Sequence, residues 1–166
     1  VINLAEAVNR YTDIDAYVDS HLRLDAKKLH NMPFIYITTD KSFELTFIEA
    51  ENLGIYLRNG GFAVIDNGTP EYEYSQAEAS LRQMLRDALG KDARFEPIPN
   101  NHPLFHCFFD FDDGPPLGNE IERVVISSRA GGSIFDRMSS IALFLEGIWI
   151  DGRLVAVYSD KGYAHK

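Results

Sequence analysis

Residues 46–90 contain two helix-start signatures with a short apolar strand between them. Thr46 and Glu49 fit a capping box, in which a hydroxyl and a carboxylate satisfy free backbone donors, and Ser75 with Glu78 repeats the pattern. The run from Phe62 to Asp66 lies between these helices. Helices of this length alternating with strands predict right-handed crossovers and a sheet with parallel pairing.

Apolar residues at helical spacing extend both predictions. The first helix is expected to end at Gly60 in the left-handed conformation, and the second is expected to end at Gly90. The residues expected to be buried are Ala50, Leu53, Gly54 and Leu57 in the first helix, and Ala77, Leu81, Met84, Leu85, Ala88 and Leu89 in the second.

Further elements are predicted on both sides of this unit. Helical spacing favours a helix over 2–11 and a turn of helix before Pro33. Strands are expected at 14–18, 34–38, 94–99, 104–111, 124–127, 145–150 and 154–159. Asp151-Gly152 between the last two indicates a hairpin, because both residues accept positive φ. The chain is therefore predicted to be one three-layer α/β domain over 1–166, with a mainly parallel sheet and a C-terminal β-hairpin.

Composition excludes several classes of function. The chain has 166 residues and a net charge of −9, which disfavours a nucleic-acid partner or an anionic lipid surface. We find no run of about 20 apolar residues, so no membrane span is expected in this chain. One cysteine excludes an internal disulfide and a multi-cysteine zinc site.

Several segments together resemble one bacterial family. They are NLAEAVNRYTDIDAY, LRLDAKKLHNMPFIYIT, AENLGIYLRNGGFAVID, NHPLFHCFF and LEGIWIDGRLVAVYSDKGYA. This sequence resembles the uncharacterised domain of unknown function 4159, whose fold is similar to class I glutamine amidotransferases. The likeness covers residues 3–164 and implies a flavodoxin-like sheet. It also implies a first strand before Asn3, so the sheet is expected to have an open edge that another segment or chain supplies.

The resemblance carries expectations about setting and chemistry. Relatives are often exported or membrane-anchored beside von Willebrand factor type A proteins and MoxR-type ATPases, which implies protein partners in an envelope-associated assembly and a periplasmic or membrane-associated location. A class I amidotransferase has a cysteine in the turn after the strand at 62–66. Here that turn reads Asp66, Asn67, Gly68 and Thr69. Neither Cys nor Ser is present, so a pseudoenzyme without cofactors is expected.

The same turn is a candidate ligand site. Asp66, Asn67, Gly68 and Thr69 follow a central strand, where open α/β sheets bind their ligands. Backbone amides there could hold an anion, and Asp66 could hold a cation or a sugar hydroxyl. The alternative is that DNGTP is a turn made of turn-forming residues.

A second constellation is NHPLFHCFFDFDD. On an extended strand His102, His106 and Asp110 would share one face, and two imidazoles with a carboxylate can bind Zn or Fe(II). At about 3.3 Å per residue, however, they span about 26 Å, too far for one ion. No metal is therefore predicted, and His102 and His106 are placed at the rim of the candidate ligand site. The acidic residues of DFDD are expected to form a solvated turn. Cys107 is expected to be a buried, inert thiol within the strand.

Three hypotheses follow for the function. The first is a non-catalytic binding or interaction module with its site at the strand-end turn. The second is a hydrolase or lyase acting on a carbohydrate-like substrate, with Asp66 or Asp110 as base and His102 or His106 as acid. The third is a structural role in which the open sheet edge makes a homo-oligomer.

Overall fold

The computed structural model describes residues 2–70, 74–119 and 144–165. Its centre is a sheet in the order β1-β2-β5-β4-β3. The strands are β1 (Phe34–Thr39), β2 (Phe62–Asn67), β3 (Glu96–Pro97), β4 (Glu146–Ile150) and β5 (Arg153–Ser159). β1–β2 and β2–β5 are parallel, whereas β5–β4 and β4–β3 are antiparallel. The sheet is mixed, so the prediction of a mainly parallel sheet was wrong.

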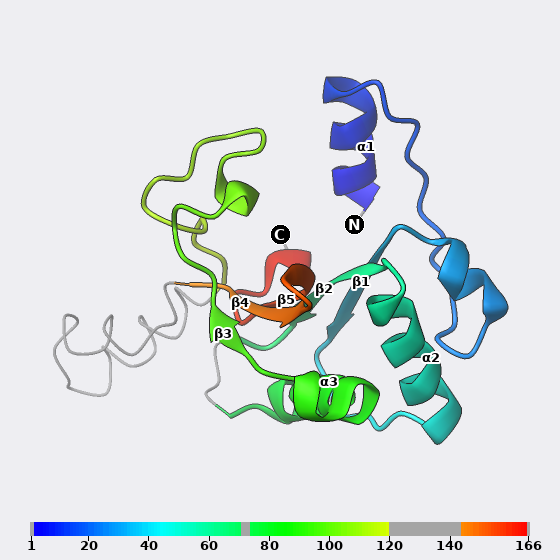
Figure 1. Cartoon of the computed structure of the whole chain (residues 1–166). Helices are drawn as coiled ribbons and strands as arrows, with labels where there is room; N and C mark the ends of the chain where they lie inside the picture. Colours follow the sequence, from blue (N-terminus) through cyan, green and yellow to red (C-terminus); the bar gives the residue numbers. More distant parts are fainter. Residues whose placement is uncertain (1, 71–73, 120–143, 166) are drawn as a thin grey trace, which may run out of the picture.

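The helices are unequally distributed over the sheet. They are α1 (Ile2–Tyr11), α2 (Phe47–Arg58) and α3 (Gln76–Leu89), with single 3-10 turns η1 (Lys27–Asn31), η2 (Gly90–Asp92), η3 (Pro103–Phe105) and η4 (Tyr163–His165). α2 and α3 cover one face, and α1 stands over the other face beside the loop around η3 (Figure 1). No residue of α1 is buried. The described chain is therefore an α/β fold with one well-packed helical layer.

Both predicted helix starts are present. At α2 the Thr46 side chain accepts the Glu49 N–H, and the Glu49 carboxylate accepts the Thr46 N–H, which completes the capping box. At α3 the Ser75 hydroxyl accepts the Glu78 N–H at 3.1 Å. Glu78 itself binds Arg82 on the next turn instead of closing a box. The capping residues thus fix where both helices begin, as predicted.

The main core lies between the sheet and the two packed helices. Every residue predicted to be buried in α2 and α3 is buried, and Tyr56 joins them. Gly54 is needed where the helices meet, because a Cβ there would lie 2.2 Å from the Ala88 carbonyl oxygen of α3. The strand residues of this core include Ile35, Ala63, Ile65, Ala156 and Tyr158. A smaller cluster on the opposite face contains Ile98, Phe105, Leu145 and Val157.

The predicted C-terminal hairpin is confirmed. Asp151 and Gly152 have φ of 50° and 76°, so both turn residues are left-handed, as a two-residue turn of this type requires. The turn joins β4 and β5, and β5 then lies parallel to β2. Because β5 lies between β4 and β2 in the sheet, the C-terminal end of β5 lies beside the C-terminal end of β2.

Three predicted strands fail for physical reasons. Residues 14–18 form exposed coil, because no neighbouring strand pairs with them in the described structure. The run 104–111 contains η3 and bends, since Pro103 begins a 3-10 turn instead of a strand. The strand expected at 94–99 is reduced to the two residues of β3. The strand expected at 124–127 lies outside the described residues.

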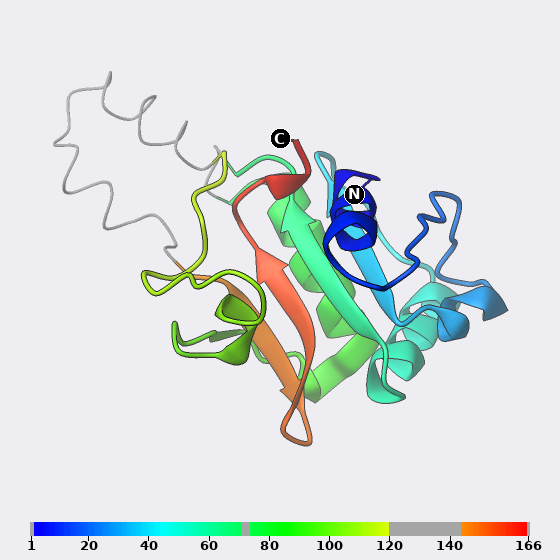
Figure 2. The same ribbon diagram turned by 90° about the horizontal axis from the view of Figure 1, so that it is seen from above.

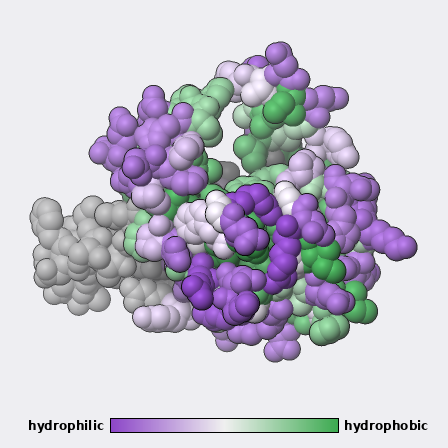
Figure 3. Space-filling view, viewed as in Figure 1, coloured by the Kyte–Doolittle hydropathy of each residue, from purple (hydrophilic) through white to green (hydrophobic). Residues whose placement is uncertain are grey.

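α1 is held by few contacts. The Asn9 side chain exchanges two hydrogen bonds with the backbone of Ala16, at 2.8 and 2.6 Å, which ties the helix to the coil that follows it. The Tyr11 ring meets Phe108 at 6.1 Å between centroids. In Figure 3, α1 and the loop around η3 rise from the body of the molecule and meet at their tips, with apolar residues on α1. No helix within the described ranges is long and apolar enough to cross a membrane.

Candidate functional site

Asp66 is the next-to-last residue of β2, in the interior of the sheet, and is fully buried. In the strand register Thr38, Asp66 and Ser159 stand side by side on β1, β2 and β5. The Asp66 Oδ2 accepts a hydrogen bond from the Tyr36 hydroxyl at 3.0 Å and another from the Ala164 N–H at 2.9 Å. One carboxylate oxygen therefore joins the edge strand β1 to the C-terminal turn η4.

The second carboxylate oxygen of Asp66 is different. Oδ1 is buried and has no hydrogen-bond partner of normal geometry within the described part of the chain. Burial raises the pKa of Asp66, and the nearby Ser159 hydroxyl, Ala164 amide and Tyr36 hydroxyl oppose that rise. A buried carboxyl with one unsatisfied oxygen holds its proton to a higher pH than a solvated one.

The rest of the turn satisfies its own polar groups. The Asn67 Oδ1 accepts the Thr69 N–H at 3.0 Å, and its Nδ2 donates to Asp160. The Gly68 N–H donates to the Thr39 carbonyl at 2.9 Å. These contacts hold β1, β2 and the segment after β5 together. Asn67, Gly68 and Thr69 therefore have a structural role that needs no ligand.

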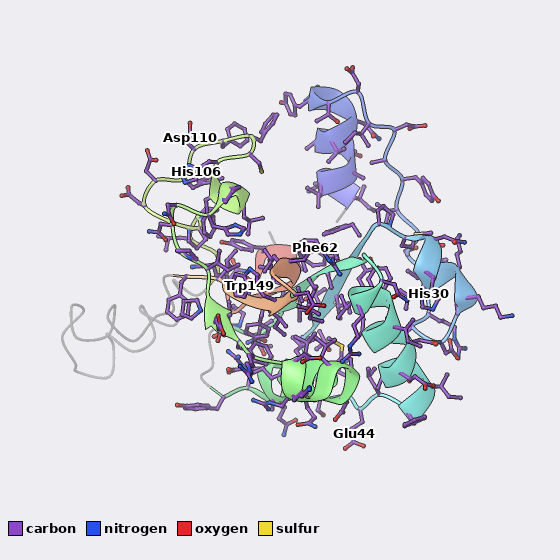
Figure 4. The ribbon with its side chains drawn as sticks, in the orientation of Figure 1. His30, Glu44, Phe62, His106, Asp110 and Trp149 are labelled. Atoms are coloured by element: carbon purple, nitrogen blue, oxygen red, sulfur yellow. The ribbon has the colours of Figure 1, made fainter. Side chains whose placement is uncertain are left out.

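His102 and His106 lie on the loop around η3. His102 caps η3, where its Nδ1 accepts the Leu104 N–H at 3.1 Å. The two nitrogens of His106 lie 2.8 Å from the Asn100 carbonyl oxygen and 3.1 Å from Asp110 Oδ1. Both contacts, with the Asn100 carbonyl first, raise the pKa of His106. Figure 4 shows His106 and Asp110 close together on this loop.

The candidate residues thus form two groups. No hydrogen bond or ion pair joins Asp66 to His102 or His106 where the chain is described. The one-face arrangement of His102, His106 and Asp110 was wrong, because it assumed an extended strand and the chain bends at η3. In the described ranges no three His, Cys, Asp or Glu side chains are grouped closely enough to hold a metal ion.

One further prediction concerns a neighbouring residue of His106. Cys107 was expected to be buried but is exposed, since its segment is a surface loop. The end of β5 lies beside the strand-end turn, where Ser159 pairs with Asp66 and Asp160 accepts a hydrogen bond from Asn67. Tyr158 faces the other side of the sheet, where the Arg82 guanidinium lies 4.2 Å from its ring centroid.

A groove of about 570 Å³ lies along the free side of β1. Within the described ranges β1 pairs only with β2 and is the edge of the sheet. The groove is lined by α1, by the coil that follows it and by β1: Ile2, Leu4, Ala5, Val8, Ala16, Tyr17, Val18, Asp19, Ser20, Leu22, Leu24, Met32, Phe34, Ile35, Tyr36 and Ile37. The family resemblance led us to expect an open sheet edge, and the helix expected at 2–11 is present, with its apolar residues in the groove instead of in a core.

The fold and these sites define an α/β protein with a mixed sheet, a buried carboxyl group (Asp66) at its centre and an open strand edge. The family model described as Domain of unknown function (DUF4159) matches residues 1–165, so the chain belongs to that family. A comparison with curated proteins gives no match.

Proposed function

We propose that this chain is a non-catalytic interaction module that binds an extended polypeptide segment along the open edge of β1. The observation that carries the proposal is the apolar groove beside that edge. An edge strand presents unpaired N–H and C=O groups, and an added strand satisfies them. The envelope-associated assembly implied by the family resemblance is the setting we propose for the partner.

Backbone hydrogen bonding supports this reading. Among the described residues, β1 is hydrogen-bonded along one side to β2, and the Thr39 carbonyl accepts the Gly68 N–H. No other backbone segment in those ranges pairs with residues 34–38. The outer side of β1 is therefore available to a strand that enters the groove.

The shape of the groove favours a single segment over a second folded copy. The coil between α1 and η1 passes outside β1, at the margin of the sheet (Figure 2). Seven residues of this coil line the groove opposite β1: Ala16, Tyr17, Val18, Asp19, Ser20, Leu22 and Leu24. The sheet edge of a second copy would meet this coil before it reached β1. A homo-oligomer through β1 is therefore the less favoured outcome.

The proposal is tested with seven-residue peptides displayed on phage and selected against the chain. Leu4→Glu places a carboxylate on the groove wall at a residue that is 47% exposed. Ile48→Glu is the matched control, because Ile48 lies in the first turn of α2, is 59% exposed and does not line the groove. We expect selected peptides to bind wild type and Ile48→Glu and to lose binding to Leu4→Glu.

Hydrogen exchange shows where a selected peptide binds. A bound strand should slow amide exchange in residues 34–38, because their outward N–H groups gain partners. Selected peptides that bind Leu4→Glu as well as wild type would refute the proposal. So would a failure to select any peptide that protects β1.

A second candidate is a small-ligand site at the strand-end turn of Asp66, Asn67, Gly68 and Thr69. The unsatisfied Oδ1 of Asp66 favours it, since buried polar groups without partners mark sites of strain or binding. Metals, nucleotides, sugars and amino acids would be screened by thermal shift on wild type and Asp66→Ala. A ligand at a hundred times its dissociation constant stabilises the fold by about 2.7 kcal/mol.

The alternative of a hydrolase or lyase on a carbohydrate-like substrate rests on the His106–Asp110 pair, at 3.1 Å. Both nitrogens of His106 already contact protein oxygens, so substrate binding would have to displace one. Glycosidase and lyase assays on wild type and His106→Gln test this idea. Activity unchanged by His106→Gln would refute it.

A flavodoxin-like or amidotransferase-like fold stays part of the proposal. The two parallel pairings and the polar turn at the end of β2 support it. The antiparallel strands β3 and β4 depart from a flavodoxin-like parallel sheet. A solved structure of a relative would test whether the fold is nevertheless of that type.

A further inference from the structure

We infer that the segment bound in the β1 groove is an uninterrupted apolar run of about four or five residues, with apolar side chains toward both faces and no acidic residue. The inference rests on the proposed function and specifies its partner. It follows from the two walls of the groove, its charges and its length.

One wall belongs to the α1 side of the sheet. Ile35 and Ile37 pack into the core with α2 and α3, so alternation along β1 turns Phe34 and Tyr36 to the opposite face. α1 stands over that opposite face (Figure 1) and contributes Ile2, Leu4 and Val8 to the groove. Side chains of an added strand that point this way would meet α1.

The other wall belongs to the main core. Leu22, Leu24 and Met32 line the groove and also pack against the core beneath α2 and α3. Side chains on the second face of an added strand would meet these three residues. The added strand would thus be covered on both faces, which is the environment of a strand inside an α/β domain.

Strands covered on both faces have nearly continuous apolar sequences. β1 and β2 begin FIYI and FAVI, in agreement with this rule. An alternating apolar and polar strand would instead bury its polar side chains against an apolar wall without partners. Binding should therefore favour the continuous pattern over the alternating one.

The charges of the lining residues further restrict which segments can bind. Asp19 is the only ionisable acid or base among the lining residues apart from tyrosine, and it forms an ion pair with Lys28 at 2.6 Å. The hydrogen bond from Lys28 lowers the pKa of Asp19, which keeps it ionised. A carboxylate on the bound segment would find no cation in the lining, and the ammonium of Lys28 is already paired with Asp19. Acidic segments are excluded on this ground.

Length follows from β1. The lining includes Phe34, Ile35, Tyr36 and Ile37 but not the last two residues of the strand. Four paired residues span about 13 Å at about 3.3 Å per residue. The segment that fits is shorter than an average strand and needs polar flanks to stay soluble.

The test uses three synthetic peptides with two lysines at each end. Their central residues are Val-Ile-Val-Ile-Val, Val-Ser-Val-Ser-Val and Val-Glu-Val-Glu-Val. We expect the first to bind about a hundredfold more tightly than the second, because two buried isoleucines replace two serines. The third should not bind detectably. The control is the first peptide N-methylated at all five central residues. It keeps its side chains and loses its backbone donors along both edges.

The outcomes separate the inference from the function on which it rests. Equal affinity of the first two peptides, with binding lost in Leu4→Glu and β1 protected, would retain strand addition and refute the two-wall inference. Binding of the N-methylated control as tightly as its parent would refute strand addition itself. Absence of binding by all three would refute both.

Discussion

Replacing Asp66 tests whether its buried carboxyl fastens the sheet to the C-terminal turn. In Asp66→Ala the Tyr36 hydroxyl and the Ala164 N–H lose their common acceptor, bound at 3.0 and 2.9 Å. Each unsatisfied donor costs about 1–3 kcal/mol, and relief of carboxyl burial offsets part of the loss. We expect the free energy of unfolding to fall by about 2–4 kcal/mol at pH 7. For this chain length that lowers Tm by about 5–15 °C.

Asp66→Asn is the matched variant. Its amide oxygen can accept both hydrogen bonds while the residue stays neutral, so it should lose less than half of what Asp66→Ala loses. Because burial raises the pKa of Asp66, the stabilisation linked to its bound proton is present below the ordinary aspartate range and is lost as pH rises through the raised pKa. Relative to wild type, Asp66→Asn should therefore gain stability from about pH 4 upward.

The assay is urea unfolding of the three proteins between pH 4 and pH 8, followed by circular dichroism. Loss of less than about 1 kcal/mol in Asp66→Ala would refute the fastening role. Asp66→Asn as unstable as Asp66→Ala at every pH would show that the charge itself is required. That result would contradict the burial argument.

Three further predictions concern packing, titration and reactivity. Gly54→Ala should lower the free energy of unfolding by about 1–3 kcal/mol, measured by urea unfolding, because its methyl group meets a backbone carbonyl of α3. NMR titration should give His106 a pKa above the usual histidine range, because of its contacts with Asn100 and Asp110, and Asp110→Asn should lower that pKa. The stability contributed by the protonated His106 is lost as pH rises through the raised pKa. Cys107 should react with a thiol reagent in the native protein as fast as in urea, and protection of the native thiol would contradict its exposure.

Local signals in the sequence predicted the helical layer well. Capping residues, helical periodicity and Asp151-Gly152 act within a few residues, so α2, α3 and the hairpin could be placed from sequence. The predicted strand at 14–18 failed because alternation cannot reveal whether a partner strand is present. The strand at 104–111 failed because its apolar residues serve a 3-10 turn and an exposed loop.

Sequence reasoning found part of the candidate site. It placed Asp66 at the end of a central strand, since helix–strand order determines which strand lies in the middle. It did not find Tyr36, because a tyrosine in an apolar run looks like a core residue. It grouped the histidines with Asp66 without a physical reason, since the distance between the two loops depends on the pairing of β3 and β4.

Tyr36 connects the two proposed sites and affects how their experiments are read. Its side chain lines the β1 groove, and its hydroxyl donates to Asp66. Asp66→Ala would free Tyr36 to move, so a ligand lost in that variant could have been bound at either site. Tyr36→Phe separates the cases, because it removes the hydrogen bond and keeps the apolar ring in the groove. A groove-bound peptide should tolerate Tyr36→Phe, whereas a ligand held at the strand-end carboxyl should respond to it, since the Asp66 Oδ2 loses one of the two hydrogen bonds that it accepts. If Tyr36→Phe abolished peptide binding while Leu4→Glu left it unchanged, the site would lie at Asp66 and not along β1.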